Sequence, residues 1–435
     1  MNLKHSAIFT ILIINIFLTL GNSKLIAVVE FIRHGARTPM AFMESSAKLY
    51  FGARKAQLTV NGFRQHVLLG RWLRRRYVKG EIGKLFSKKI NSNEIKVYAS
   101  PRQRTIFSAT AHILGLLPNS FVKIEIQDKN MKNNDIPPLK NYNIKKSDGR
   151  EVIINVLNYK VDYYFHALYC SYPGSTNKIK YTMKKSHVID LSIKQISTAC
   201  KDILNKYDLL FRQKQSYSSQ KKHKAFQENY KKSTFSKKFF KKLIDFIRPF
   251  KYHHASYKNL DPEHFITVKK FLINKWYETR LKDSQELKIS ISGFAVKIID
   301  FFENNIKQKS VEKMMIFSGH DNNIVDFLSN IIHPSYLRKR IDNALNNLDD
   351  FFFLVPRLAS SLLLELHEEN NMYYISIVYN GQRINNVRFR MPVKFYEKDN
   401  KVDYNDFRNL LKSRIYDGYN KLVCGRKKYL SKKFV

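Results

Sequence analysis

Three short segments carry residue types that could grip and transfer an anionic group. They are Arg33-His-Gly-Ala-Arg-Thr-Pro39, a segment around Arg104, and His320-Asp321. Arginine stays charged and presents a rigid fork of donors to anionic oxygens. Histidine and aspartate supply a nucleophile and a proton donor. Together these types suit phosphoryl transfer, in which the protein contributes positioning and electrostatic stabilisation.

Each of these residues has an expected role. The guanidinium groups that would hold the phosphate oxygens without a metal belong to Arg33, Arg37 and Arg104. Their positive charge would lower the pKa of His34, so that its neutral ring can attack phosphorus. Asp321 would protonate the leaving oxygen and later accept a proton from water. His320 would be a further donor to the phosphate.

The elements that must position these segments alternate between strands and helices. The mostly apolar run Lys24–Ile32 predicts a buried central strand that ends beside Arg33. Ile95–Ala99 and Lys313–Phe317 predict strands before the other two segments, and 360–366 with 372–378 predict a hairpin. This rhythm indicates a parallel sheet of the α/β type. Ligands of such sheets bind beyond the carboxyl ends of the strands, so the three segments should converge there.

The sequence therefore predicts an α/β fold with a mainly parallel sheet, helices on both faces and a mostly α-helical cap insertion. The core occupies residues 24–126 and resumes at 287–435, where it is followed by a C-terminal tail. The Lys-, Asn- and Tyr-rich middle, 127–286, is the expected cap. Residues 1–23 read as a signal peptide.

The N-terminus supports export of the chain. Lys4 precedes a largely apolar run from Ala7 to Leu20, and small residues follow at Gly21 and Ser23. A membrane anchor is the alternative, but the run falls short of the ~20 residues that a spanning helix needs. We expect cleavage near Ser23, no transmembrane anchor afterwards, and a location outside the cell or in a lysosome-like vesicle lumen.

The net charge of +41 allows nucleic-acid binding, attraction to anionic substrates, or drift of the composition toward lysine. No RNA-binding signature, zinc-finger spacing or basic zipper accompanies it, so no nucleic-acid partner is expected. The isolated histidines also lack the spacing of a metal site. The expected partner is a small phosphomonoester, and the oligomeric state stays open, with a dimer among the possibilities.

Beyond these residues, the motifs resemble those of the histidine acid phosphatase family. Arg33-His-Gly-Ala-Arg-Thr-Pro39 is similar to the family signature, and His320-Asp321 to its distal acid motif. Further matches in the family's order are Leu58-Thr-x-x-Gly62-x-x-Gln65, Leu69-Gly-Arg-x-Leu-Arg74 with Tyr77, Arg104-Thr-x-x-Ser108-Ala and Val378-Tyr-Asn-Gly381. The similarity covers roughly 25–117 and 314–382. It implies metal-free hydrolysis of phosphomonoesters at acid pH, without a cofactor, through a phosphohistidine on His34.

The same resemblance implies a disulfide between Cys170 and Cys424, which would leave Cys200 as a free thiol. One departure concerns the proton-donor segment, where Asn322-Asn323 stands in place of the family's usual threonine pair. The leaving-group side of the pocket is therefore an open question.

Other functions remain open. Within the same chemistry, the substrate could be an inositol polyphosphate, as in phytases, or a lysophospholipid. A catalytically inactive, secreted polyanion-binding relative and a cytosolic mutase-type relative are the further alternatives. The intact site residues argue against the first of these, and the signal peptide and Ala36-Arg37 argue against the second.

Overall fold

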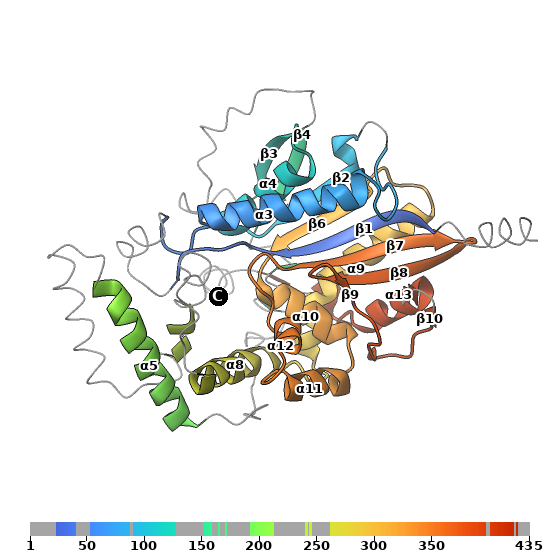
Figure 1. Ribbon diagram of the computed structural model, residues 1–435. Coiled ribbons are helices and arrows are strands. Elements are labelled where there is room, and N and C mark those ends of the chain that lie inside the picture. Colours follow the sequence, from blue (N-terminus) through green and yellow to red (C-terminus); the bar gives the residue numbers. More distant parts are fainter. Residues whose placement is uncertain are drawn as a thin grey trace, which may run out of the picture.

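The computed structural model (Figure 1) describes residues 23–40, 53–87, 90–127, 151–158, 164–165, 170–171, 192–212, 240–241, 243–245, 262–396, 401–421 and 423–424. The predicted signal peptide lies outside these residues, apart from its last position, Ser23.

A single mixed sheet forms the centre of the molecule. Its strands are β1 (Lys24–Arg33), β2 (Ile95–Ala99), β3 (Phe121–Ile126), β4 (Glu151–Val156), β6 (Met314–Gly319), β7 (Ser361–Glu369), β8 (Met372–Tyr379), β9 (Gln382–Arg383), β10 (Phe395–Tyr396) and β11 (Lys401–Asp403). Their order is β10-β11-β8-β7-β1-β6-β2-β4-β3, with β9 paired to β8. In the part of the sheet with the order β1-β6-β2-β4-β3, all neighbouring strands are parallel. β7 and β8 form the predicted hairpin, antiparallel to β1.

Helices cover both faces of this sheet, as predicted (Figure 1). They are α3 (Val60–Leu73), α4 (Gln103–Leu116), α9 (Gln285–Ile306), α10 (Asp321–Ile331), α11 (Pro334–Asn343), α12 (Leu348–Leu354) and α13 (Tyr404–Ser413). The α/β class expected from the sequence is thereby confirmed. None of the helices within the described residues is long and apolar enough to cross a membrane.

The central strand β1 is buried because both of its faces are covered. Val28 and Ile32 belong to the hydrophobic core beneath α3 and α4. Ala27, Val29 and Phe31 belong to the core on the opposite face, with α9 and α10. This alternation with a period of two explains why the run is apolar almost throughout, as is typical of a strand buried on both sides.

The segment expected to be the insertion contains α5 (Ile193–Arg212) and α8 (Pro262–Tyr277), which contact each other. It also contains β4, which pairs with β2 and β3 in the main sheet. The core therefore extends to Val156, beyond the expected start of the insertion at 127. β4 has only six residues, so its alternation of apolar and polar side chains is short. The polar residues around it in the sequence made this pattern hard to recognise as a strand.

Candidate active site

The ends of β1 and β6 bring two of the three predicted segments together. In the parallel ladder Arg33 pairs with Gly319, the residue before His320. The backbone N–H of His34 donates to the Gly319 carbonyl, with 3.1 Å between nitrogen and oxygen. The predicted nucleophile therefore lies directly beside the predicted acid segment.

The third segment joins them through β2. Ser100, just beyond β2, donates its backbone N–H to Ser318 in β6 at 3.1 Å. Its Oγ lies 3.0 Å from Nε2 of His320. Arg104 follows in the first turn of α4. The ends of β1, β6 and β2 thus converge, as the sequence predicted.

The surroundings of His34 determine which of its ring nitrogens carries the proton. Its side chain is almost fully buried, at 4% exposure. Nδ1 lies 2.9 Å from the carbonyl oxygen of Gly35. Because a carbonyl oxygen can only accept, Nδ1 carries the proton and the lone pair of the neutral ring is on Nε2.

Burial and neighbouring charges keep this ring neutral. Burial lowers the pKa of His34 well below its usual value of 6.5. The positive charges of three arginines lower the pKa further, in the order Arg104, Arg33 and Arg37, followed by His320. Removal from water and positive neighbours both disfavour an imidazolium, so the ring takes up a proton only at a lower pH than an ordinary histidine does.

Arg33, the neighbour of His34 in the chain, pairs with the predicted proton donor. Its Nη2 lies 2.9 Å from Oδ2 of Asp321, and its side chain is 3% exposed. Its Nη1 donates to the carbonyl oxygen of Pro356 at 2.6 Å. The Asp321 carboxyl, at the N-terminus of α10, is more open, with 17% of its side chain exposed. Of this pair, the Asp321 carboxyl is thus the one more accessible to solvent.

His320, at the start of α10, lies against His34. The ring centroids of His34 and His320 are 5.6 Å apart, with the rings nearly perpendicular. The backbone N–H of His320 donates to Oδ1 of Asn323 at 2.8 Å, and Nδ2 of Asn323 reaches the carbonyl of Phe165 at 3.3 Å. Asn323, one of the two residues that depart from the family's threonine pair, is therefore buried and holds the start of α10.

The backbone after His34 is held by residues that the sequence motifs contained but whose role the sequence did not reveal. Gly35 donates its N–H to Ser108 Oγ at 3.1 Å, and Ala36 donates its N–H to Gln65 Oε1 at 2.8 Å. Gln65 in α3 and Ser108 in α4 thus support the loop.

Close packing against α3 leaves no room for a side chain at Gly35. A Cβ built on Gly35 would lie 2.4 Å from the carbonyl oxygen of Gly62. Gly62, in the first turn of α3, would in turn place a Cβ 2.1 Å from the carbonyl oxygen of Ala36. Thr59 caps this helix by accepting from the Gly62 N–H at 3.3 Å. The two glycines allow the helix start and the loop to touch.

A main-chain clamp closes the other side of the loop. Ser360 accepts from the backbone N–H of Arg33 at 2.9 Å, and Ala359 donates its N–H to the carbonyl of His34 at 3.2 Å. With the contact from Arg33 to Pro356, the segment before β7 holds both residues. No side-chain motif marks this segment, so the sequence gave no sign of its role.

Two buried histidines lie below the loop. Nε2 of His66 lies 3.1 Å from the carbonyl oxygen of Arg33, which requires the ring to donate there. Nε2 of His112 lies 3.0 Å from Oε2 of Glu30, whose Oε1 accepts from Ser361 Oγ at 2.6 Å. Each of these histidines has a polar partner within the fold. Within the described residues no group of His, Cys, Asp or Glu could hold a metal ion.

Arg37 lies in the same site but has a partner that the sequence did not predict. Its Nη2 donates to Oδ1 of Asp245 at 2.7 Å. Asp245 belongs to the middle segment, where a lone aspartate among lysines carries no motif. The structure thus gathers all six predicted residues and adds this carboxylate.

The two cysteines of the predicted disulfide lie opposite each other on paired strands. β5 (Cys170–Ser171) and β12 (Val423–Cys424) pair antiparallel, and Cys170 is opposite Cys424. Directly opposed residues have the Cα separation that a disulfide needs. Cys200 in α5 is buried and free, as expected, and burial raises the pKa of its thiol to about 12.

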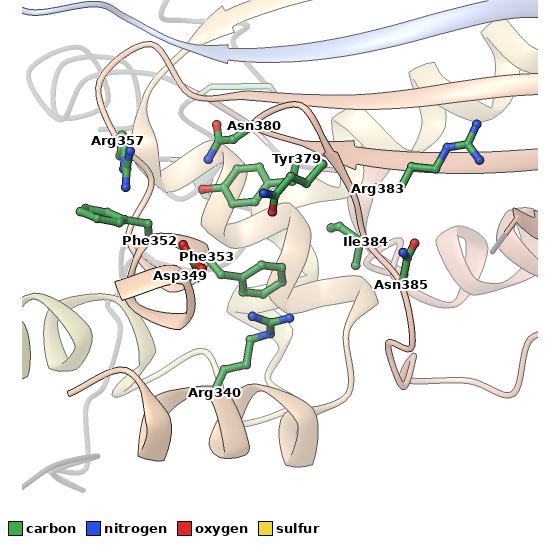
Figure 2. A pocket seen from close by; sticks show the side chains of 11 residues that line it. Arg340, Asp349, Phe352, Phe353, Arg357, Tyr379, Asn380, Arg383, Ile384 and Asn385 are labelled. Atoms are coloured by element: carbon green, nitrogen blue, oxygen red, sulfur yellow. The ribbon is translucent and has the colours of Figure 1, made fainter. Parts of the chain in front are cut away.

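A separate pocket of about 240 Å³ lies beyond the clamp, between α11, α12 and the end of β8 (Figure 2). None of the six predicted site residues lines it. Arg357 is on its wall, with its guanidinium 3.5 Å from the Phe352 ring centroid, and Arg340 donates to Asp350. This pocket is therefore separate from the predicted site.

Comparison with known proteins agrees with this geometry. The family model described as histidine phosphatase superfamily (branch 2) matches residues 24–380. Putative acid phosphatase 5 of Caenorhabditis elegans is 35% identical over 89 residues, covering 20% of each chain. Testicular acid phosphatase of Mus musculus is 32% identical over 106 residues, covering 23% of this chain and 24% of that protein. The aligned part thus spans about a quarter or less of these curated relatives.

Solved structures share the fold over nearly the whole chain. The multiple inositol polyphosphate phosphatase of Bifidobacterium longum, in complex with inositol hexasulfate, has a TM-score of 0.53 at 11% identity, covering 92% of this chain and 94% of that one. The phytase from D. castellii has a TM-score of 0.52 at 13% identity, covering 95% and 86%. At such identities the likeness concerns the fold alone. Because the family match spans most of the sequence and includes all six predicted site residues, the chain belongs to branch 2 of the histidine phosphatase superfamily.

Proposed function

We propose that the chain hydrolyses phosphomonoesters at acid pH through a phosphohistidine intermediate on His34, without a metal. The observation that carries this proposal is the state of the His34 ring. Its pKa is held well below 6.5, its Nδ1 is committed to Gly35, and three arginines surround it. A neutral imidazole in a cationic pocket is suited to attack a bound phosphate.

In the first step the guanidinium groups bind the phosphate oxygens of the substrate, and Nε2 of His34 attacks phosphorus. The P–N bond forms as the bond from phosphorus to the ester oxygen breaks. Asp321 gives its proton to that oxygen, and the alcohol leaves. The backbone bond from Nδ1 to Gly35 stabilises the positive charge that the ring acquires.

In the second step water attacks phosphorus, and the P–N bond breaks. Asp321, now ionised, accepts the proton of the water, which restores both residues and releases orthophosphate. The 2.9 Å pair between Arg33 and Asp321 keeps the carboxyl beside the reacting group. Bound phosphate brings negative charge to Arg33 and so favours the protonated carboxyl that the first step requires.

The experiment is to trap the phosphoenzyme. Wild-type protein is mixed with a radiolabelled aryl phosphate at acid pH, quenched in alkali and assayed for protein-bound label. We expect label and turnover in the wild type, and neither in His34→Ala. The control is His333→Ala, which removes a histidine that caps α11 away from the site. Label that persists in His34→Ala would refute the intermediate.

Two further arms of this experiment test the remaining parts of the proposal. Addition of a chelator should leave the rate unchanged, and strong inhibition would reveal a metal. A panel with an aryl phosphate, an alkyl phosphate, phytate and a lysophosphatidate assigns the substrate class. Absence of turnover on every member from pH 4 to pH 8 would favour the inactive polyanion-binding alternative.

Export and the disulfide belong to the same proposal. We expect the chain to be found in a secretory lumen or the medium, with Cys170 and Cys424 joined. Thiol titration of the unfolded, unreduced mature protein should find one reactive thiol, that of Cys200. Three thiols would refute the disulfide, and a cytosolic location would refute export.

A further inference from the structure

The insertion contributes a carboxylate to the phosphate-binding loop. Oδ1 of Asp245 accepts from Nη2 of Arg37, and Oδ2 accepts from the backbone N–H of Met40, both at 2.7 Å. The side chains of Arg37 and Asp245 are 10% and 18% exposed. A single carboxylate thus ties the guanidinium to the loop that carries it, with both of its oxygens engaged in a partly desolvated place.

Asp245 is itself held by apolar packing. Phe240, Leu243 and Ile244, in the helical residues just before it, are buried in the same hydrophobic core as α8. The ring of Phe240 packs edge-on against Phe271 of α8, with 5.0 Å between centroids. Because these three neighbouring side chains are buried, the backbone that carries Asp245 is held in place, and the carboxylate has little freedom to move away from Arg37.

The helix that supports this packing is anchored to the α/β core. Tyr277 donates its hydroxyl to the carbonyl of Leu354 at 3.2 Å, and Lys269 Nζ donates to the carbonyl of Leu345 at 2.7 Å. The connection therefore runs from the core through α8 to Asp245, and from there to the catalytic loop. The position of Arg37 depends on the insertion as well as on β1.

The contacts of Arg37 also determine which donors remain for a ligand. A guanidinium has five N–H donors. Nη1 uses one on the carbonyl of Thr38 at 2.8 Å, and Nη2 uses one on Asp245. Within the described residues three N–H donors of Arg37 are left without a partner. With two bonds fixing its plane, the fork is oriented before a phosphate arrives, which reduces the ordering cost of binding.

We propose that Asp245 is a positioning residue that orients Arg37 for the phosphate group of the substrate. The inference rests on the proposed function, since Arg37 must bind phosphate for its orientation to matter. The alternative is that Asp245 weakens phosphate binding. A carboxylate this close could repel the phosphate dianion, and its removal would then tighten binding.

Binding of inorganic phosphate, measured by calorimetry at pH 5, distinguishes these cases in a double-mutant cycle. The variants are Asp245→Ala, Arg37→Ala and the pair together. We expect Asp245→Ala to raise the dissociation constant by about tenfold or more, because the fork loses its orientation. In the Arg37→Ala background the same change should matter by less than about twofold, because the residue it acts through is gone.

Asp202→Ala is the matched control. It removes a carboxylate of the insertion that pairs with His264 at 2.9 Å rather than with the catalytic loop. Its phosphate affinity should equal that of the wild type. Asp245→Asn, which keeps one acceptor for Arg37, should lie between the wild type and Asp245→Ala. The ratio kcat/KM for an aryl phosphate should fall in the same order.

Three results would overturn the inference. They are unchanged binding in Asp245→Ala, tighter binding in that variant, and an equal loss in the presence and absence of Arg37. Failure of the proposed function has a different signature. In that case the wild type binds phosphate, with the cycle intact, but gives no turnover and no phosphoenzyme.

Discussion

His66 offers a test of how the site is supported, and its effect can be calculated. The ring lies below the catalytic loop, fully buried, with its Nε2 3.1 Å from the Arg33 carbonyl. Burial, together with the positive charge of His112 when protonated, lowers the pKa of His66 to about 3. In the unfolded chain the pKa should return to about 6.5.

This difference makes folding depend on pH. Between pH 3 and pH 6.5 the unfolded chain binds a proton at His66 that the folded chain does not. The free energy of unfolding therefore rises with pH in that window. From pH 8 to pH 5 this one residue should cost about 2 kcal/mol of stability. Because the loss at pH 5 depends on the unfolded pKa, it changes little if the folded pKa lies anywhere below 4.

The variant His66→Gln keeps an N–H donor in nearly the same place but does not titrate. Urea unfolding of both proteins at pH 8 and at pH 5 measures the effect. We expect the wild type to lose about 2 kcal/mol more than the variant between these pH values. An equal loss in both proteins would show that His66 titrates normally in the folded state, and the buried, donating role assigned to it would be wrong.

Two more predictions concern the catalytic groups. Asp321→Asn should lower kcat by about a hundredfold or more for an alkyl phosphate but by less than about tenfold for an aryl phosphate, whose leaving oxygen needs little protonation; equal losses in a steady-state comparison would mean that Asp321 is not the acid. Gly35→Ala should lower kcat/KM by about a hundredfold, because its Cβ would lie 2.4 Å from a backbone oxygen of α3 and the loop must shift. Gly418→Ala is its control, since the atoms near that position belong to the movable Tyr416 side chain, and activity like that of the wild type in Gly35→Ala would refute the close-packing argument.

The sequence sufficed for the parts of the molecule in which function and local pattern coincide. Arg33, His34 and Arg37 follow an apolar strand, and His320 follows another, so strand ends and reactive residues could be located together. The alternation of strands with helices indicated a parallel sheet. These signals are local, and a parallel sheet converts them into one site.

The remaining parts of the site depend on long-range packing that leaves no local pattern. Asp245 is separated from Arg37 by more than two hundred positions and becomes meaningful only when α8 and Phe240 bring it there. The parallel strand β4 was missed because its six residues lie in a polar stretch. The reason for Gly35 was also hidden, because its constraint comes from another glycine, Gly62.

The direction of β7 has a consequence for how this site can change. Because β7 runs opposite to β1, the chain enters β7 beside His34, and the residues just before it contribute a backbone carbonyl and a backbone N–H to the site. Ala359 adopts a φ of 59° there, a left-handed conformation that costs an alanine about 1 kcal/mol. Exchanges of side chains at Arg357 or Leu358 leave these backbone groups in place. Loss or gain of a single residue between Pro356 and Ser360 would displace these backbone groups. This segment should therefore tolerate substitutions far better than insertions or deletions.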